Sequence, residues 1–414
     1  MDYKAKFLRI KKPTLKPIQH EESIETIEYE PSGLVCLSIE GSRALYPFKE
    51  GMKVKIGEIV SINGNDVFLS PLTGTLRSVQ ETKGYLNKPI LNLFFERDKS
   101  VKYDSSISYF LQSGKKFDLL KTLNMIPGMR PYTLPQQSEK LDAIVISAVE
   151  EDPFTCINGF YLKKYQKELT EAITFLKEFT RRIILVSGER EPVPVNISGL
   201  ESYKKEFHYP NSLPHLIVKD VLGKAIPMGK AFEEYNIGFL DLNQVILLGQ
   251  VIVNGNLVTS KPVYVDFDGK VKIVTVPFGT LIGDILAQLS IGRYNMVIAN
   301  GLIRGQSIYD LNTPVLPSLN SIFVRYHVLE NSDLETECIN CGECVRICPS
   351  KIPVNLLIRY LKNKKYEDAM TLCDLMACLE CGMCSFVCVS RIPIFHYVML
   401  AKYELSLMEK KEEE

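Results

Sequence analysis

Apolar and polar positions alternate with different periods along the chain. Residues 34–95 hold short apolar runs separated by turn residues, a pattern typical of β-strands. An apolar run at 142–152 ends in acidic residues, and it is followed by helical periodicity over 161–182 and a second apolar run at 183–188. Strand, helix and strand in this order indicate a parallel sheet, so this part is expected to be an α/β domain.

The next part of the chain is again rich in apolar and β-branched residues. We interpret residues 245–265 as a hairpin that turns at Asn254-Gly255. Residues 271–289 are expected to form a strand pair leading into a short helix capped near Gly279-Thr280. A hairpin followed by a helix predicts a β-grasp-like unit.

Helical periodicity returns near the end of the chain. Residues 351–377 repeat apolar side chains at helical spacing, and residues 392–411 have the pattern of an amphipathic helix. The chain ends in the charged sequence KEEE, which we expect to be a solvated tail.

Composition narrows the function classes. The 414 residues are 46% hydrophobic and 24% charged, which favours several folded domains over a disordered scaffold. The 49 basic and 49 acidic residues cancel, so nothing favours nucleic acid as a partner. No apolar stretch approaches the roughly 18 residues of a spanning helix, and the first residues lack the apolar core of a secretory signal. We therefore expect a cytoplasmic protein.

Nine of the eleven cysteines fall between Cys338 and Cys388, while Cys36 and Cys156 are isolated. The dense region contains CINCGECVRICPS, starting at Cys338, and CLECGMCSFVCVS, starting at Cys378, which are two copies of C-x-x-C-x-x-C-x-x-x-C. This is the ligand spacing of two 4Fe-4S clusters. Zinc would leave the spacing of three cysteines plus one unexplained, and a disulfide knot is the other alternative.

The fourth cysteine of each motif is expected to bind the cluster of the other motif, as in two-cluster proteins. Small Gly342 and Gly382 would let the backbone approach the clusters. Cys373 lies outside both motifs and is interpreted as a buried apolar residue. The predicted ligands are Cys338, Cys341, Cys344 and Cys388 for the first cluster, and Cys378, Cys381, Cys384 and Cys348 for the second.

The strand-rich N-terminal part resembles the lipoyl-type barrel-sandwich domain, because it contains GMKVKIGEIV followed by SPLTG. Such carriers present a modifiable lysine at a hairpin tip. The corresponding tip here is NGND, without a lysine, so we predict a structural, unmodified domain.

Three acids follow the first strand of the α/β domain, namely Glu150, Glu151 and Asp152. Open α/β sheets usually bind ligands at the carboxyl ends of their strands, so a ligand site is one interpretation. A solvated loop is the other. No G-x-G-x-x-G follows either strand, and no P-loop is present. The histidines form no interpretable catalytic pattern, and His208 and His215 flank YPNSLP, which we expect to be a surface loop.

The order of these expected domains resembles that of the RnfC family of the Rnf ion-translocating oxidoreductase complex. The resemblance is carried by the segments SPLTG, AVEEDPF, YPNSLPHLIVKDVLG and VPFGTLIGDIL. The first three domains are also similar to the NqrA family of the sodium-pumping NADH:quinone reductase (Nqr), on RPYTLPQQSEKLDAIVISAVEEDP and GQVIVNGNLVTSKPVYV. This resemblance implies a multidomain α/β plus β fold with an α/β domain like the complex I flavin subunit. The implied domains are an N-terminal segment with a barrel-sandwich hybrid domain at 1–100, the α/β domain at 101–235, a β-grasp (SLBB-like) domain at 236–325, a helical two-cluster ferredoxin domain at 326–408 and a charged tail at 409–414.

The chain departs from the Rnf family at the flavin loop. That family carries G-x-G-G-x-x-F-P, whereas residues 124–132 read NMIPGMRPY, and Ser147 replaces the family asparagine. A backbone that approaches a phosphate needs glycines, so we expect no orthodox FMN site and no direct oxidation of NADH. Arg130 in this segment is interpreted as a salt-bridge residue, with recognition of an anion as the alternative.

The resemblance implies an electron-transfer subunit rather than a stand-alone enzyme. It would lie peripherally on the cytoplasmic membrane, held by membrane-embedded subunits of an Rnf- or Nqr-like complex and by other iron-sulfur or flavin subunits. The alternatives are a flavin-dependent subunit that oxidises NADH, and a soluble iron-sulfur adaptor of a cytoplasmic reductase complex.

Overall fold

The computed structural model describes residues 15, 24–29, 33–98, 100–133, 140–189, 191, 197–326 and 335–413. Most of the expected N-terminal segment, and Glu414 of the expected tail, lie outside these residues. The chain divides into two compact units. One comprises Met1–Pro17, Phe207–Lys230 and Val328–Glu414, and the other comprises Ile18–Glu206 and Ala231–His327. The four-domain division remains a prediction.

The strands expected within residues 34–95 are confirmed. They form a sheet in the order β2-β7-β6-β3 and a hairpin of β4 and β5. The hairpin turns at Asn63 and Gly64, which both have positive φ. Its tip is the NGND segment, which contains no lysine. That this part is a lipoyl-type domain remains a prediction. The elements are β2 (Leu34–Glu40), β3 (Lys53–Val54), β4 (Ile59–Ile62), β5 (Asn65–Leu69), β6 (Gly74–Lys83), the 3₁₀ turn η2 (Tyr85–Asn87) and β7 (Pro89–Arg97).

The predicted parallel sheet of the α/β part is also confirmed. Its strand order is β10-β9-β8-β11, and all three strand pairs are parallel. The predicted helix is two helices, because the backbone leaves helical geometry at Tyr165. The elements are α1 (Ser106–Gln112), α2 (Lys116–Leu123), β8 (Ala143–Ser147), α3 (Asn158–Lys164), α4 (Gln166–Leu176), β9 (Ile183–Ser187), β10 (Leu200–Lys204), η3 (Phe232–Tyr235) and β11 (Ile237–Asp241).

The hairpin expected at Asn254-Gly255 is wrong, because residues Leu242–Asn254 form helix α6. The Asp241 side chain accepts a hydrogen bond from the Gln244 backbone N–H (2.8 Å), and the Gln244 side chain accepts one from the Asp241 N–H (3.0 Å). Gly255, with φ +70°, ends the helix. Most of α6 is buried on every side, so its sequence shows no polar face and resembles a buried strand.

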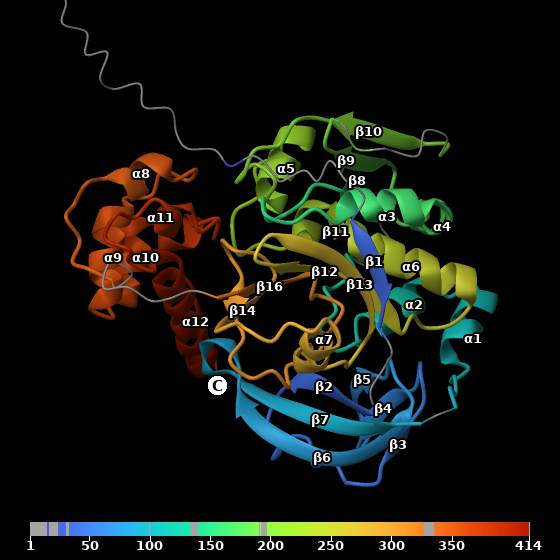
Figure 1. The fold of residues 1–414 in the computed structure, drawn as a ribbon. Helices are drawn as coiled ribbons and strands as arrows, with labels where there is room; N and C mark the ends of the chain where they lie inside the picture. Colours follow the sequence, from blue (N-terminus) through green and yellow to red (C-terminus); the bar gives the residue numbers. More distant parts are fainter. Residues whose placement is uncertain are drawn as a thin grey trace, which may run out of the picture. The chain divides into compact units, whose positions relative to one another are not determined.

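The true hairpin lies one segment later. Strands β12 and β13 pair antiparallel and turn at Asp268-Gly269, within a sheet ordered β1-β13-β12-β16-β14-β15. Figure 1 shows helix α7 beside this sheet. The strand pair expected at 271–289 is wrong, because this segment contributes one strand, β13, whose antiparallel partner β12 precedes it. The short helix expected after it is confirmed as α7, while the β-grasp assignment remains a prediction. The elements are β1 (Glu25–Glu28), β12 (Ser260–Phe267), β13 (Lys270–Pro277), α7 (Ile282–Gln288), β14 (Met296–Ala299), β15 (Gln306–Ser307) and β16 (Ser321–Arg325).

The described C-terminal part is helical, as predicted. Helices α9, α10 and α12 pack around a core that contains the buried Cys373. Helix α12 continues through Glu413, so most of the expected tail is helical. The elements are α5 (Pro214–Leu222), α8 (Glu343–Ile347), α9 (Val354–Lys362), α10 (Tyr366–Cys373), η5 (Leu375–Ala377), α11 (Met383–Phe386) and α12 (Ile394–Glu413).

The expectation of a surface loop at YPNSLP is wrong. Tyr209, Ser212 and Leu213 are buried, and the Tyr209 hydroxyl donates a hydrogen bond to the Cys381 carbonyl. Prolines and asparagine suggested a loop, but its aromatic and apolar side chains pack inside the unit that contains the cysteine motifs.

Candidate iron-sulfur centres and a polar cleft

The two cysteine motifs fold in the same way. Each has a short helix directly after its glycine, and each has three positive-φ residues at positions that correspond between the two motifs. These pairs are Asn340 and Glu380, Gly342 and Gly382, and Lys351 and Arg391. The glycines supply a left-handed backbone that L-residues rarely adopt, which is the conformational reason for glycine in each motif.

The start of the first motif lies beside the end of the second. The Thr336 backbone N–H donates to the Ser390 carbonyl (3.0 Å), and the Ser390 hydroxyl donates to the Glu337 carbonyl (2.9 Å). These bonds bring Cys388 toward the three cysteines that begin at Cys338.

The four cysteines predicted for the second cluster line one pocket of about 430 Å³. They are Cys348, Cys378, Cys381 and Cys384. Ile352, Leu357 and Val398 form apolar walls around them. Burial, together with the neighbouring thiols, raises the pKa of Cys384 well above its usual value.

The four cysteines predicted for the first cluster also lie close together, in a more open place. Burial raises the pKa of Cys344 to about 11, and Cys341, Cys338 and Cys388 contribute to the same shift by their proximity. Cys338 and Cys341 are exposed. The neighbours of Cys344 therefore include Cys388 from the other motif.

Each set of four thiols has the number of ligands that one cubane takes, because a cubane distributes four thiolates over four irons. No disulfide forms among the cysteines. Among the described residues, no three histidine, cysteine or acidic side chains form a group that could bind one metal ion. The ligand assignment itself remains a prediction.

The loop of the second motif accepts hydrogen bonds from two residues outside the motif. Lys402 of α12 donates to the Cys378 carbonyl (2.9 Å) and to Glu380 Oε1 (2.7 Å), and Tyr209 donates to the Cys381 carbonyl. Neither residue was predicted. The sequence does contain a signal for Lys402, because it follows Lys362 at the same spacing that separates Cys378 from Cys338.

A second feature is a polar cleft at the carboxyl end of β8. It is open to solvent and is lined mainly by polar residues. The acids predicted there do line it, so the interpretation as a solvated loop is wrong: Asp152 is buried and the other two are partly buried.

Each of these acids is bound by the chain itself. The Glu150 carboxylate accepts hydrogen bonds from the backbone N–H groups of Ile157 and Asn158, both at 2.6 Å. Burial nevertheless raises the pKa of Glu150 to about 7. Asp152 accepts from the N–H groups of Phe154 (2.9 Å) and Ile303 (3.2 Å), and burial raises its pKa.

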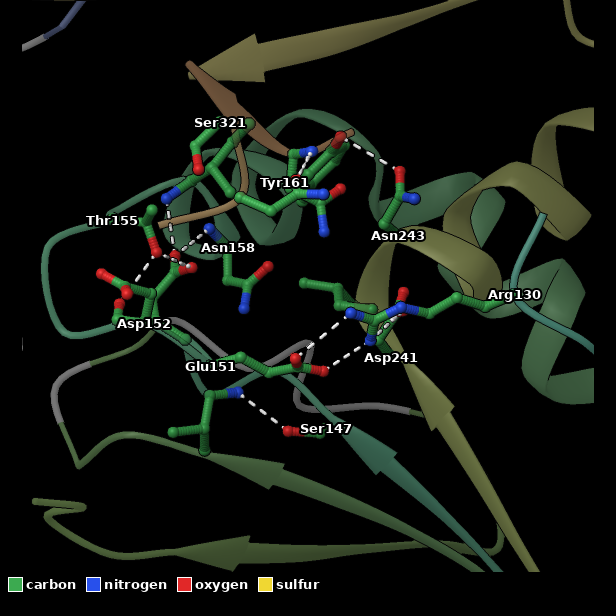
Figure 2. Close-up of a pocket in the computed structure, with 16 residues that line it drawn as sticks. Arg130, Ser147, Glu151, Asp152, Thr155, Asn158, Tyr161, Asp241, Asn243 and Ser321 are labelled. Carbon is green, nitrogen blue, oxygen red and sulfur yellow. Dashed lines mark hydrogen bonds and ion pairs between the residues drawn. The ribbon is translucent and has the colours of Figure 1, made fainter. Parts of the chain in front are cut away.

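Arg130 forms the predicted salt bridge. Its guanidinium contacts both Glu151 and Asp241 (Figure 2), at 2.5 Å and 3.1 Å. Burial alone would raise the pKa of Glu151, but Arg130 and then Arg304 outweigh burial and hold that pKa below its usual value. Arg130 is thus shared between two carboxylates of the chain.

The cleft also contains polar residues that the sequence did not single out. Tyr161 donates to Asn243 (3.2 Å), and both residues line the cleft. Behind this lining, the fully buried Lys261 donates to the Pro317 carbonyl and to the lining residue Asn320, both at 2.7 Å. Burial lowers the pKa of Lys261 to about 7. Asn158, Asn300 and Ser321 complete the lining. These residues come from distant segments, so only the fold brings them together.

The segment in place of the glycine-rich loop is tightly packed. Gly128 has φ +71°, and a Cβ there would lie 2.6 Å from the Leu316 side chain. Ser147 is buried in the wall of the cleft, and its hydroxyl lies 3.4 Å from the Val149 N–H. The one remaining glycine therefore serves packing against Leu316.

The resemblance to RnfC proteins is confirmed by comparison with curated proteins, while the similarity to the NqrA family remains a prediction. The chain is similar to proteins named as the RnfC subunits of ion-translocating oxidoreductase complexes: 26% identical over 240 residues in Buchnera aphidicola, 21% over 244 in Pectobacterium carotovorum and 22% over 243 in Vibrio cholerae. The matches cover 54% to 55% of this chain, and 50%, 33% and 31% of those relatives. The chain thus spans half or less of their length.

Other comparisons add little. No family model matches the chain. A solved structure of phthalate dioxygenase reductase, a modular protein for electron transfer from pyridine nucleotides to [2Fe-2S], aligns over 75% of this chain and 97% of that one. Its identity is 10% and its TM-score is 0.17, too low to support an argument. Among the described helices, none is long and apolar enough to cross a membrane.

Proposed function

We propose that this chain is an electron-transfer subunit of an ion-translocating oxidoreductase complex, and that it carries two 4Fe-4S clusters. The observation that carries the proposal is the grouping of the cysteines. Each set of four combines three cysteines of one motif with the fourth of the other, which is the arrangement of two-cluster ferredoxins. The clusters would supply one-electron transfer when bound.

The chain's own residues would hold and insulate the clusters. In the second site, Cys348, Cys378, Cys381 and Cys384 would be the ligands, and the apolar walls would limit access of water. In the first site, Cys338, Cys341, Cys344 and Cys388 would be the ligands, with Cys338 and Cys341 at the surface. A surface cluster suits exchange of electrons with a partner protein.

The partners are proposed from the similarity to RnfC proteins. We propose membrane-embedded subunits and further iron-sulfur or flavin subunits as partners, with this chain on the cytoplasmic face of the membrane. Co-purification with subunits encoded by neighbouring genes tests this. Capture by a water-soluble reductase alone would instead support the soluble adaptor.

The cluster content is tested by metal analysis of anaerobically prepared protein. The expected result is about eight irons and about eight acid-labile sulfides per chain, because each cubane contains four of each. Iron near four, or zinc in its place, would refute the two-cluster assignment.

We further propose that the polar cleft binds neither FMN nor NADH tightly. Glu150 and Asp152 already accept backbone hydrogen bonds that a phosphate would need, and Arg130 is shared between two carboxylates. Acids in the cleft would also repel a dianionic phosphate. The test is a flavin titration by fluorescence quenching with the clusters intact, followed by anaerobic addition of NADH. Stoichiometric micromolar binding, with reduction of the clusters by NADH alone, would support the flavin enzyme instead.

A further inference from the structure

Two lysines occupy equivalent positions in the repeat that carries the cysteines. Lys362 and Lys402 are separated by the same offset as the two motifs, and they lie on the helices that follow the first and the second motif. The two motifs share three positive-φ positions, so the two lysines can be compared at corresponding places of the repeat.

The two lysines have different surroundings. Lys402 is 13% exposed and bonds both the carbonyl of a proposed ligand, Cys378, and the carboxylate of Glu380 inside the same loop. Lys362 is 34% exposed and pairs with Glu335, which precedes the first motif. The position equivalent to Glu380 is Asn340, an uncharged residue bonded to Asn355 (3.0 Å).

We propose that Lys402 and Glu380 are positioning residues that set the reduction potential of the second cluster, with opposite signs. The inference rests on the proposed function, because it requires a cluster at this site. Lys402 fixes the loop of Cys378 and brings a positive charge into it, while Glu380 brings a negative charge to the same loop.

The sign follows from elementary electrostatics. Reduction adds an electron to the site, so a nearby positive charge favours the reduced state and a nearby negative charge opposes it. Both side chains are largely withdrawn from solvent, so water and salt screen them less than they screen the more exposed Lys362–Glu335 pair. The second cluster should therefore respond to these two residues more strongly than the first responds to Lys362.

The experiment is a set of anaerobic redox titrations followed by electron paramagnetic resonance, on the full chain. The variants are Lys402→Met, Lys402→Arg and Glu380→Gln, and Lys362→Met is the matched control. Titrations at pH 8 keep His215 uncharged, because burial lowers the pKa of this neighbour of Glu380 and Lys402. The signal of the second cluster is identified in Cys388→Ala protein, where the first site lacks a ligand.

We expect Lys402→Met to lower the potential of the second cluster, by a change on the order of tenfold in the reduction equilibrium, about 59 mV for one electron. Glu380→Gln should raise that potential, Lys402→Arg should leave it near the wild-type value, and Lys362→Met should not affect it. Shifts of opposite sign in Lys402→Met and Glu380→Gln indicate an effect of charge. Simple damage to the loop would instead shift or broaden the signal of the second cluster in the same way in both variants.

Several results would overturn the inference: an unchanged potential in Lys402→Met, shifts of the same sign in Lys402→Met and Glu380→Gln, or an equal effect of Lys362→Met on the second cluster. If Lys402→Met fails to retain iron, Glu380→Gln decides, since its upward shift supports the inference and an unchanged potential refutes it. Wild-type protein without about eight irons would refute the proposed function instead.

Discussion

We predict that the fourth cysteine of each motif binds the cluster of the other motif, and removal of Cys388 tests this. This residue belongs to the second motif in sequence, but it lies among the neighbours of Cys344 in the first site. Each proposed site has four cysteines, so loss of one would leave a cubane with three protein ligands. We expect Cys388→Ala to lose the first cluster and its iron to fall from about eight to about four per chain.

The assay combines iron analysis with electron paramagnetic resonance of the reduced protein. The signal left in Cys388→Ala should match that of Cys338→Ala and differ from that of Cys378→Ala. Cys373→Ala is the matched control, because this cysteine is fully buried but lies outside both sets. It should retain about eight irons, with a loss of stability on the order of 1 kcal/mol from the deleted sulfur. If the signal of Cys388→Ala matches Cys378→Ala, each motif binds its own cluster and the grouping is wrong.

Three further predictions concern the other unit and use denaturant unfolding. Arg130→Met removes the partner of two carboxylates. Because the arginine side chain is 42% exposed, we expect the free energy of unfolding to fall by about 1–2 kcal/mol, less than for a fully buried pair. An unchanged free energy of unfolding would refute a structural role. Gly249→Ala would place a Cβ 2.0 Å from the Glu168 carbonyl and should cost about 1–3 kcal/mol, whereas Gly33→Ala, with no atom within 4 Å, should cost far less. Lys261 has a folded pKa of about 7, below the value of 10.5 in the unfolded chain, so the unfolded chain binds more protons between these pH values and stability should rise with pH there. From pH 7 to 9.5 the rise should be about 3 kcal/mol and should be absent in Lys261→Met; a rise that persists in the variant would show that another group causes it.

The cysteine motifs were predictable because their chemistry is local in sequence. Three thiols at a spacing of three residues, followed by a fourth, indicate a candidate ligand set before any fold is known. The glycines and the constant offset between the motifs likewise fix the repeated left-handed backbone at Gly342 and Gly382. The helices between and after the motifs follow from plain helical periodicity.

The failures have a common physical cause, which is burial decided by distant segments. Helix α6 is apolar on almost every side, so its sequence has no period that distinguishes it from a buried strand. Its capping pair, Asp241 and Gln244, was the local evidence for a helix start. The segment around Tyr209 has loop-forming residues, and it is buried by contacts with residues far away in the sequence, among them Cys381 and Leu15.

The acids of the cleft show why a correct position does not establish a ligand. The strand end places Glu150, Glu151 and Asp152 at the edge where α/β sheets bind substrates, and the structure puts all three in the cleft. Yet each already has partners within the chain: backbone N–H groups for two of them and Arg130 for the third. A bound anion would have to displace these partners. The displacement would cost free energy, because buried hydrogen-bonding groups and charges would be left without partners. Of the motif cysteines, one group of four lines a pocket and the other lies around Cys344, which is why we propose ligands there and not in the cleft.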